Sequence, residues 1–100
     1  MTNQNIKETL YYNLPGVFLS KINSSMRAIQ FEHTDDMVTV RCYFDGEITE
    51  EILGDMDEAE TDLLSHFNPA MAVIECIRVD MPNSIVGNNS SKWFYMRKEP

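Results

Sequence analysis

The sequence lacks the short motifs that mark most enzymes and cofactor-binding proteins. Its four glycines are isolated, so there is no glycine-rich loop that could hold a phosphate group. A G-x-S-x-G nucleophile elbow is absent. The two histidines and two cysteines do not show the paired spacing of a zinc site. A small domain with neither kind of motif is expected to bind another molecule and not to be an enzyme, and no metal or cofactor is expected.

Long hydrophobic runs and a targeting segment are also absent from this sequence. No apolar run approaches the roughly 18 residues that a membrane-spanning helix needs, and the N-terminus MTNQNIKETL is polar, unlike a secretory signal. The two cysteines, Cys42 and Cys76, lie within apolar runs. They are typical of reduced core residues in a cytoplasmic protein, although the sequence leaves a disulfide between them open. We therefore expect a cytoplasmic protein.

Basic residues are scarce, with 8 Lys and Arg against 16 Asp and Glu, and the net charge is −8. Nucleic-acid binding needs a basic surface, and an anionic membrane repels an acidic protein. The composition therefore argues against both functions and favours a basic protein as the partner. A chain of 100 residues that is 43% hydrophobic is expected to form one domain, residues 1–100, with its own core.

The acidic residues are concentrated in one segment, Asp45–Asp62. This segment has no Lys or Arg and holds nine of the 16 acidic residues, so the rest of the chain has seven acidic and eight basic residues. The nine are Asp45, Glu47, Glu50, Glu51, Asp55, Asp57, Glu58, Glu60 and Asp62. Nearly all of the excess negative charge therefore belongs to one stretch of chain.

The same segment predicts an amphipathic helix. Thr49 is a candidate N-cap, and Asn68-Pro69 is a stop signal. The acids opposite the apolar stripe form either an ordinary solvated helix face or a docking face for a basic partner. The absence of interspersed Lys favours docking, because like charges on one helix face repel each other. Apolar residues recur at helical spacing at Ile52, Met56, Ala59, Leu63 and Phe67.

Hydrophobic periodicity predicts one further helix and four strands around this helix. Residues 5–22 have helical spacing, but Pro15-Gly16 interrupts them, and there we expect a kink or two short helices. Alternating apolar residues predict strands over residues 26–33, 37–45, 71–80 and 92–98. The third strand alternates poorly, as expected for a central strand covered on both sides or for a bulge. The order α-β-β-α-β-β predicts an α+β two-layer sandwich, with two helices on one face of a four-stranded, mainly antiparallel sheet.

One face of the predicted sheet should build the core and the other should be exposed. The predicted core is Ile29, Phe31, Val38, Val40, Cys42, Phe44, Ile74, Cys76, Phe94 and Met96. The exposed face would carry Gln30, Arg41, Tyr43, Glu75, Trp93, Tyr95 and Arg97. Tyr, Trp and Arg are enriched at interface centres, so Tyr43, Trp93 and Tyr95 are candidate anchors for a partner. The alternative is an ordinary antiparallel face on which aromatic residues form cross-strand pairs.

Four short stretches together resemble a known family. They are Arg27-Ala28-Ile29, Arg41-x-Tyr43-Phe44-Asp45-Gly46, Ile77-Arg78-Val79-Asp80-x-Pro82 and Tyr95-x-Arg97-x-Glu99. From about Tyr12 onwards, their order and spacing are similar to those of small bacterial proteins grouped with the immunity proteins of contact-dependent growth inhibition systems. Pro15-Gly16 departs from the uninterrupted first helix that this resemblance implies.

The resemblance implies a cytoplasmic inhibitor that binds the C-terminal toxin domain of a delivered effector, often a nuclease, and blocks it. The charge agrees independently, because a nuclease holds phosphates in a basic cleft that an acidic protein can cover. The candidate partner-binding residues are Asp45, Glu47, Glu50, Glu51, Asp57, Glu58, Tyr43, Trp93 and Tyr95. Two alternatives stay open. One is an acidic adaptor or oligomeric subunit without a toxin partner, and the other is a small enzyme that uses carboxylates or His33 and His66.

Overall fold

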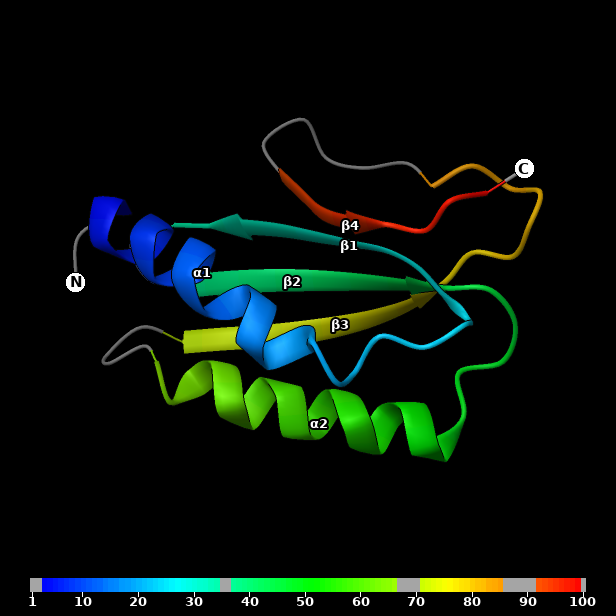
Figure 1. Cartoon of the computed structure of the whole chain (residues 1–100), viewed down its shortest axis with the longest axis horizontal. Helices are drawn as coiled ribbons and strands as arrows, with labels where there is room; N and C mark the ends of the chain where they lie inside the picture. Colours follow the sequence, from blue (N-terminus) through cyan, green and yellow to red (C-terminus); the bar gives the residue numbers. More distant parts are fainter. Residues whose placement is uncertain (1–2, 35–36, 67–70, 86–91, 100) are drawn as a thin grey trace.

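The computed structural model describes residues 3–34, 37–66, 71–85 and 92–99. Two helices and one four-stranded sheet follow each other in the predicted order α-β-β-α-β-β, so the predicted α+β fold is confirmed (Figure 1). The elements are α1 (Asn3–Phe18), β1 (Met26–His33), β2 (Met37–Phe44), α2 (Glu50–Leu64), β3 (Met71–Arg78) and β4 (Lys92–Met96).

The sheet has the strand order β3-β2-β1-β4. β1 is antiparallel to both of its neighbours, β2 and β4. β2 and β3 are parallel, because α2 returns the chain to the end of the sheet where β2 began. β3 is therefore an edge strand with a regular register, and the prediction of a central or bulged strand is wrong. Its partly buried Ile74 and Cys76 pack against the core, while the Ile74 N–H donates to the Glu60 carboxylate at 3.0 Å.

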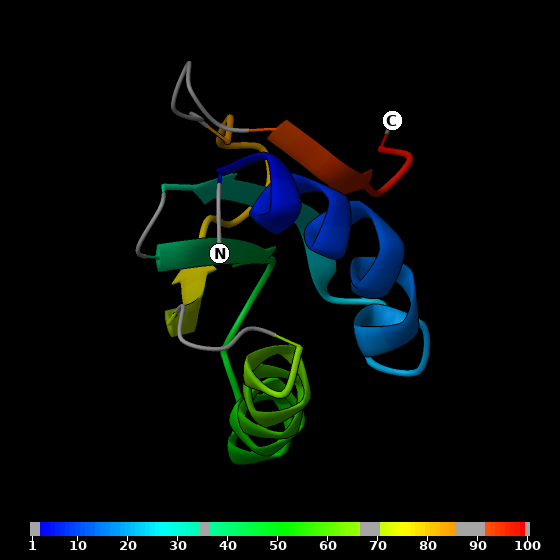
Figure 2. The same cartoon turned by 90° about the vertical axis from the view of Figure 1, so that its left-hand side faces the viewer.

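Both helices lie on the same side of the sheet and share one core with it (Figure 2). α1 contributes Leu10, Leu14, Val17 and Phe18, which recur at helical spacing and are buried. Six of the predicted core residues on β1 and β2 are buried: Ile29, Phe31, Val38, Val40, Cys42 and Phe44. Ile74, Cys76 and Phe94 are partly buried against this core. Met96 does not belong to the core, because its side chain is 61% exposed.

A bulge in β4 explains the error at Met96. Trp93 pairs with Gln30 and Tyr95 pairs with Ile29, so Phe94 is an extra residue in β4. Phe94 and Tyr95 both pack against the core, and the Phe94 ring lies 6.2 Å from that of Phe18. The alternation of β4 is therefore reversed after the bulge, which turns Met96 to the opposite face.

α1 passes through Pro15 as a single helix. Of the two predicted alternatives, a kink or two short helices, the second is wrong, and the helix is uninterrupted, as the family resemblance implies. Pro15 lies in the last turn and is exposed, so its missing N–H removes one hydrogen bond near the end of the helix. Its carbonyl still accepts a hydrogen bond from the Leu19 N–H at 2.9 Å.

Candidate functional site

α2 forms because its start is capped and its two faces differ. Thr49 is the N-cap, and its hydroxyl oxygen accepts a hydrogen bond from the Ile52 N–H at 3.2 Å. Glu50 and Glu51 lie in the first turn, where the positive end of the helix dipole stabilises negative charge. Phe67 of the predicted apolar stripe and the stop signal Asn68-Pro69 lie outside the described residues. The buried stripe is otherwise as predicted, with Ile52, Met56, Ala59 and Leu63.

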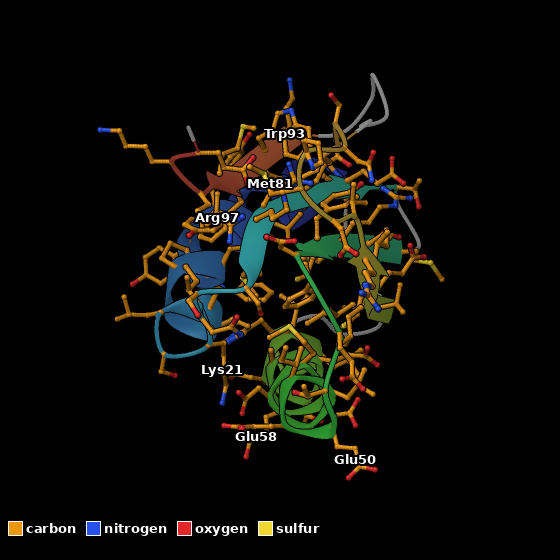
Figure 3. The ribbon with its side chains drawn as sticks, turned by 90° about the vertical axis from the view of Figure 1, so that its right-hand side faces the viewer. Lys21, Glu50, Glu58, Met81, Trp93 and Arg97 are labelled. Atoms are coloured by element: carbon orange, nitrogen blue, oxygen red, sulfur yellow. The ribbon has the colours of Figure 1, made fainter. Side chains whose placement is uncertain are left out.

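The candidate acidic residues divide into an exposed group and one exception. The exposed group is Glu47, Glu50, Glu51, Asp57 and Glu58. On α2, Glu50 and Glu58 point away from the sheet (Figure 3). Asp45 is the exception, because its side chain is 35% exposed and it lies 3.5 Å from the Arg97 guanidinium. Asp45 is therefore engaged within the protein, whereas the other five face solvent.

The described basic side chains mostly pair with acids that lie outside α2. Arg41 pairs with Glu32 and Glu75, and the other such pairs are Arg27–Glu99, Arg78–Asp80, Arg97–Asp45 and Arg97–Glu99. Among the described side chains, Lys21 is the one Lys or Arg within 4.0 Å of an α2 carboxylate, with its Nζ 2.6 Å from Glu58 Oε2. Glu50, Glu51 and Asp57 have no such partner in this part of the chain. The outer side of α2 therefore keeps most of its negative charge.

Lys21 joins the end of α1 to the acidic side of α2. Its hydrogen bond to Glu58 raises the pKa of Lys21, and the nearby Asp55 and Asp62 carboxylates raise it further. The same hydrogen bond lowers the pKa of Glu58. Both groups are therefore charged at neutral pH. One ammonium group faces three carboxylates, so the local charge stays negative.

Tyr43 is not an exposed anchor, and this part of the prediction is wrong. Its side chain is 5% exposed, its hydroxyl donates to Gln30 Oε1 at 3.1 Å, and its ring lies 6.1 Å from that of Trp93. Gln30, also predicted to be exposed, is buried. Burial raises the pKa of the Tyr43 hydroxyl. The aromatic pair and the hydrogen bond fill this side of the sheet, so the tyrosine contributes to the fold.

The structure does not bring the aromatic and acidic residues together. Tyr95 is half-buried and packs against the core because of the β4 bulge. Trp93 is 41% exposed, but it lies at the opposite end of the molecule from Glu50 and Glu58 (Figure 3). The candidate acidic and aromatic residues therefore do not form one continuous surface.

The outer side of α1 is a candidate surface that the sequence analysis missed. Tyr12 is 85% exposed and Leu19, directly after the helix, is 82% exposed. Pro15 and Gly16 lie between them and are also exposed. The available signal was the absence of any charged residue from Thr9 to Ser20. Helical spacing predicts one buried face of this segment and gives no sign that apolar residues also occupy the other side.

The four stretches that carry the family resemblance meet at one end of the sheet, around Arg27. A bulge in β1 places Arg27 between the pairs Met26–Phe44 and Ala28–Tyr43 and aims its side chain to one side. Arg27 is 5% exposed and donates from Nε and Nη2 to both oxygens of Glu99, at 2.8 and 2.9 Å. Its Nη1 donates to the carbonyls of Val79 and Asn83 at 2.7 and 2.9 Å. The buried guanidinium thus has a carboxylate to balance its charge and acceptors for its N–H groups.

Three further residues complete this Arg27 network, which we define as Arg27, Asp45, Asp80, Arg97 and Glu99. Asp80 accepts a hydrogen bond from the Gly46 N–H at 2.7 Å, and Asp45 accepts one from the Met81 N–H at 3.2 Å. Arg97 Nη2 lies 3.0 Å from Glu99 Oε2. The network ties the exits of β2, β3 and β4 to β1. The residues that carry the family resemblance therefore stabilise the fold. The acidic side of α2 is not part of this network.

Because of the Arg27 network, we expect the free energy of unfolding to fall at acidic pH. The hydrogen bonds from Arg27, together with Arg97, hold the pKa of Glu99 at about 2, below its ordinary value of 4.5. A carboxyl with a lowered folded-state pKa stabilises the fold above its unfolded value, and this stabilisation is lost as the pH falls from 4.5 towards 2. We expect Glu99→Gln to show a shallower loss of unfolding free energy over this window than the wild type.

Denaturant unfolding at a series of pH values measures both slopes. Asp57→Asn is the matched control, because Asp57 is exposed in the middle of α2 and has no Lys or Arg partner among the described side chains. It should keep the wild-type slope. Equal slopes for wild type and Glu99→Gln would contradict the assignment of this pH dependence to Glu99.

The described residues hold no arrangement that is suited to catalysis by a metal or a cysteine. No group of three or more His, Cys, Asp or Glu among them is placed to hold a metal ion. Cys42 and Cys76 are free thiols at neighbouring positions on β2 and β3. Burial raises the pKa of both thiols, which disfavours the nucleophilic thiolate. In the same part of the chain, no helix is long and apolar enough to cross a membrane.

Comparison with known proteins assigns the chain to a family. A comparison with curated proteins found no match. Residues 7–99 match the family described as MafI2 immunity protein. Maf toxin–immunity systems are bacterial polymorphic toxin systems, which agrees with the resemblance carried by the four stretches around Arg27. The match covers nearly the whole chain, so this protein belongs to the MafI2 immunity protein family, and its role is that of an immunity protein with a cognate toxin.

Proposed function

We propose that this immunity protein neutralises a basic nuclease toxin by placing the outer side of α2 against the toxin's phosphate-binding residues. The observation that supports this is that, in the part of the chain that the structure describes, the acidic residues on the outer side of α2 are mostly unpaired, whereas the arginines pair with acidic residues elsewhere. Glu50, Glu51 and Asp57 are exposed without a Lys or Arg partner among the described side chains, while Arg27, Arg41, Arg78 and Arg97 pair with acids outside α2. Carboxylates can accept the same charge-assisted hydrogen bonds from Arg and Lys as phosphate oxygens do.

The charge also favours rapid capture of such a toxin. The net charge of −8 and its concentration in Asp45–Asp62 create a directional negative field. Such a field raises the association rate with a basic partner and loses strength as salt screens it. An immunity protein benefits from fast association, because it must meet the toxin before the toxin meets its substrate. Cytoplasmic location, one domain over residues 1–100 and contact-dependent delivery of the toxin stay predictions.

Co-expression of the chain with the product of the gene immediately upstream, followed by pull-down at low and high salt, tests the proposal. We expect a basic toxin domain to be recovered, with less recovered at high salt. Recovery of the chain alone or of a self-association product would contradict the proposal. That result would favour the alternative of an acidic adaptor or oligomeric subunit.

Neutralising the outer side of α2 should weaken toxin binding. We expect the triple variant Glu50→Gln, Asp57→Asn, Glu58→Gln to bind the recovered toxin domain about ten-fold or more weakly at low salt, because electrostatic steering is lost. The dependence of the binding constant on salt should also become shallower. A titration of binding against salt concentration measures both effects.

A second triple variant separates local charge from net charge. Ser24→Lys, Ser84→Lys, Glu75→Gln raises the net charge by the same three units at exposed positions outside α2. It should retain most of the wild-type affinity. If both triple variants lose affinity equally, net charge and not the α2 surface accounts for binding, and the assignment of the docking face fails.

A further inference from the structure

The outer side of α1 differs from that of an ordinary surface helix. Such a helix usually carries charged residues on the side that faces solvent, yet no charged residue occurs between Glu8 and Lys21. Tyr12, Pro15, Gly16 and Leu19 recur at helical spacing on the side opposite the buried residues. Single exposed apolar residues are common on protein surfaces, whereas a contiguous exposed group marks an interaction site.

This apolar surface has an acidic border. Lys21 follows Leu19 by two residues and forms an ion pair with Glu58 at 2.6 Å (Figure 3). The Asp55 and Asp62 carboxylates are close enough to raise the pKa of Lys21. The end of α1, where Leu19 lies, is therefore beside the acidic side of α2.

We propose that the outer side of α1, formed by Tyr12, Pro15, Gly16 and Leu19, is the apolar centre of the interface with the toxin domain, and that α2 supplies its acidic rim. This inference rests on the proposed function. The partner surface that fits is an apolar patch bordered by Lys and Arg. An apolar centre with a polar rim is the usual arrangement in protein interfaces, and Tyr is enriched among the residues that dominate binding.

Charge selects the toxin over a second copy of this chain as the occupant. A symmetric dimer through α1 would place the same surface of both copies in contact. The two α2 helices, each with carboxylates beside the apolar surface, would then approach one another. Like charges across an interface oppose association, and Lys21, two residues after Leu19, is already paired with Glu58.

The double variant Tyr12→Ala, Leu19→Ala tests the inference against the toxin domain recovered by the pull-down. We expect affinity to fall about 30-fold, as for loss of a dominant interface residue. The loss should come from faster dissociation, with little change in the association rate or the salt dependence. The thermal unfolding midpoint should not change, because both side chains are more than four-fifths exposed, at 85% and 82%. This separates lost contact from lost folding.

Met96→Ala is the matched control, because it removes a 61%-exposed apolar side chain from the face of the sheet opposite to α1, and it should bind as the wild type does. If the double variant binds normally while the neutralised α2 variant binds weakly, the inference about α1 is overturned and the proposed function stands. If the pull-down recovers no toxin, both are overturned. Sedimentation of the free chain should show a monomer. A dimer that the double variant abolishes would make α1 a self-association surface and would also overturn the inference.

Discussion

Arg27→Ala should lower the free energy of unfolding by about 3 kcal/mol, in the range for breaking a buried ion pair. Arg27 is 5% exposed, and its guanidinium holds both oxygens of Glu99 and the carbonyls of Val79 and Asn83. Alanine would leave these acceptors without their charged donor in a poorly hydrated place. For a chain of 100 residues, this corresponds to a fall of roughly 15 °C in the unfolding midpoint.

Two variants make this result specific. Arg78→Ala also removes an arginine from an ion pair, but Arg78 is 55% exposed, and exposed pairs contribute little to stability, so this variant should be far less destabilised than Arg27→Ala. Arg27→Lys keeps the charge but loses the planar fork that holds Glu99 and two carbonyls, so it should destabilise the protein almost as much as alanine does. Thermal and denaturant unfolding measure all three. A lysine variant as stable as the wild type would show that charge alone accounts for the effect of Arg27.

Leu63→Ala should lower the free energy of unfolding by about 3 kcal/mol as well, through a different cause. Leu63 is fully buried on the inner side of α2, in the core shared by both helices and the sheet. Truncation removes apolar contacts and leaves a cavity that the neighbouring side chains fill only in part. The substitution does not alter the acidic residues on the outer side of α2. Toxin binding at temperatures below the unfolding transition should therefore be retained.

Leu64 provides the control for this truncation. It is the next residue of the same helix and the same residue type, but its side chain is 40% exposed. Leu64→Ala should cost less than about 1 kcal/mol, because less apolar area is lost and no enclosed cavity forms. Denaturant unfolding of both variants measures the difference. Equal destabilisation would contradict the inward orientation of Leu63 and the outward orientation of the acidic side.

The elements with a clear hydrophobic period could be predicted from the sequence. The apolar stripe of α2 and the alternation of β2 each specify one buried face, and Thr49 marks where α2 begins. The edge position of β3 could not be read from its residues, because it follows from the parallel return of the chain through α2. The exposure of Met96 depends on the bulge at Phe94, and residue alternation within β4 gives no sign of it.

The exposure of the acidic candidate residues could be predicted from the sequence, whereas the burial of the aromatic candidates could not. Acidic residues on the outer side of a helix are exposed wherever the inner stripe is buried, so Glu50 and Asp57 could be placed from spacing alone. The burial of Tyr43 depends on contacts with Gln30 and Trp93, which belong to two other strands. The pairing of Arg27 with Glu99 likewise joins two segments that are 72 residues apart in the sequence. Contacts between distant segments leave no local pattern in a single sequence.

The position of β1 has a consequence for the order of folding. Phe31 pairs with Val40 across a short connection on one side and with Lys92, far along the chain, on the other. The β1–β2 hairpin can therefore form early, while the second edge of β1 waits for β4, because closing the longer loop costs more chain entropy. Until β4 arrives, that edge is open to pairing with other chains. We expect a newly made molecule to pass through an interval in which it is prone to aggregate, and to gain the stabilisation that Glu99 provides at neutral pH only once β4 is in place.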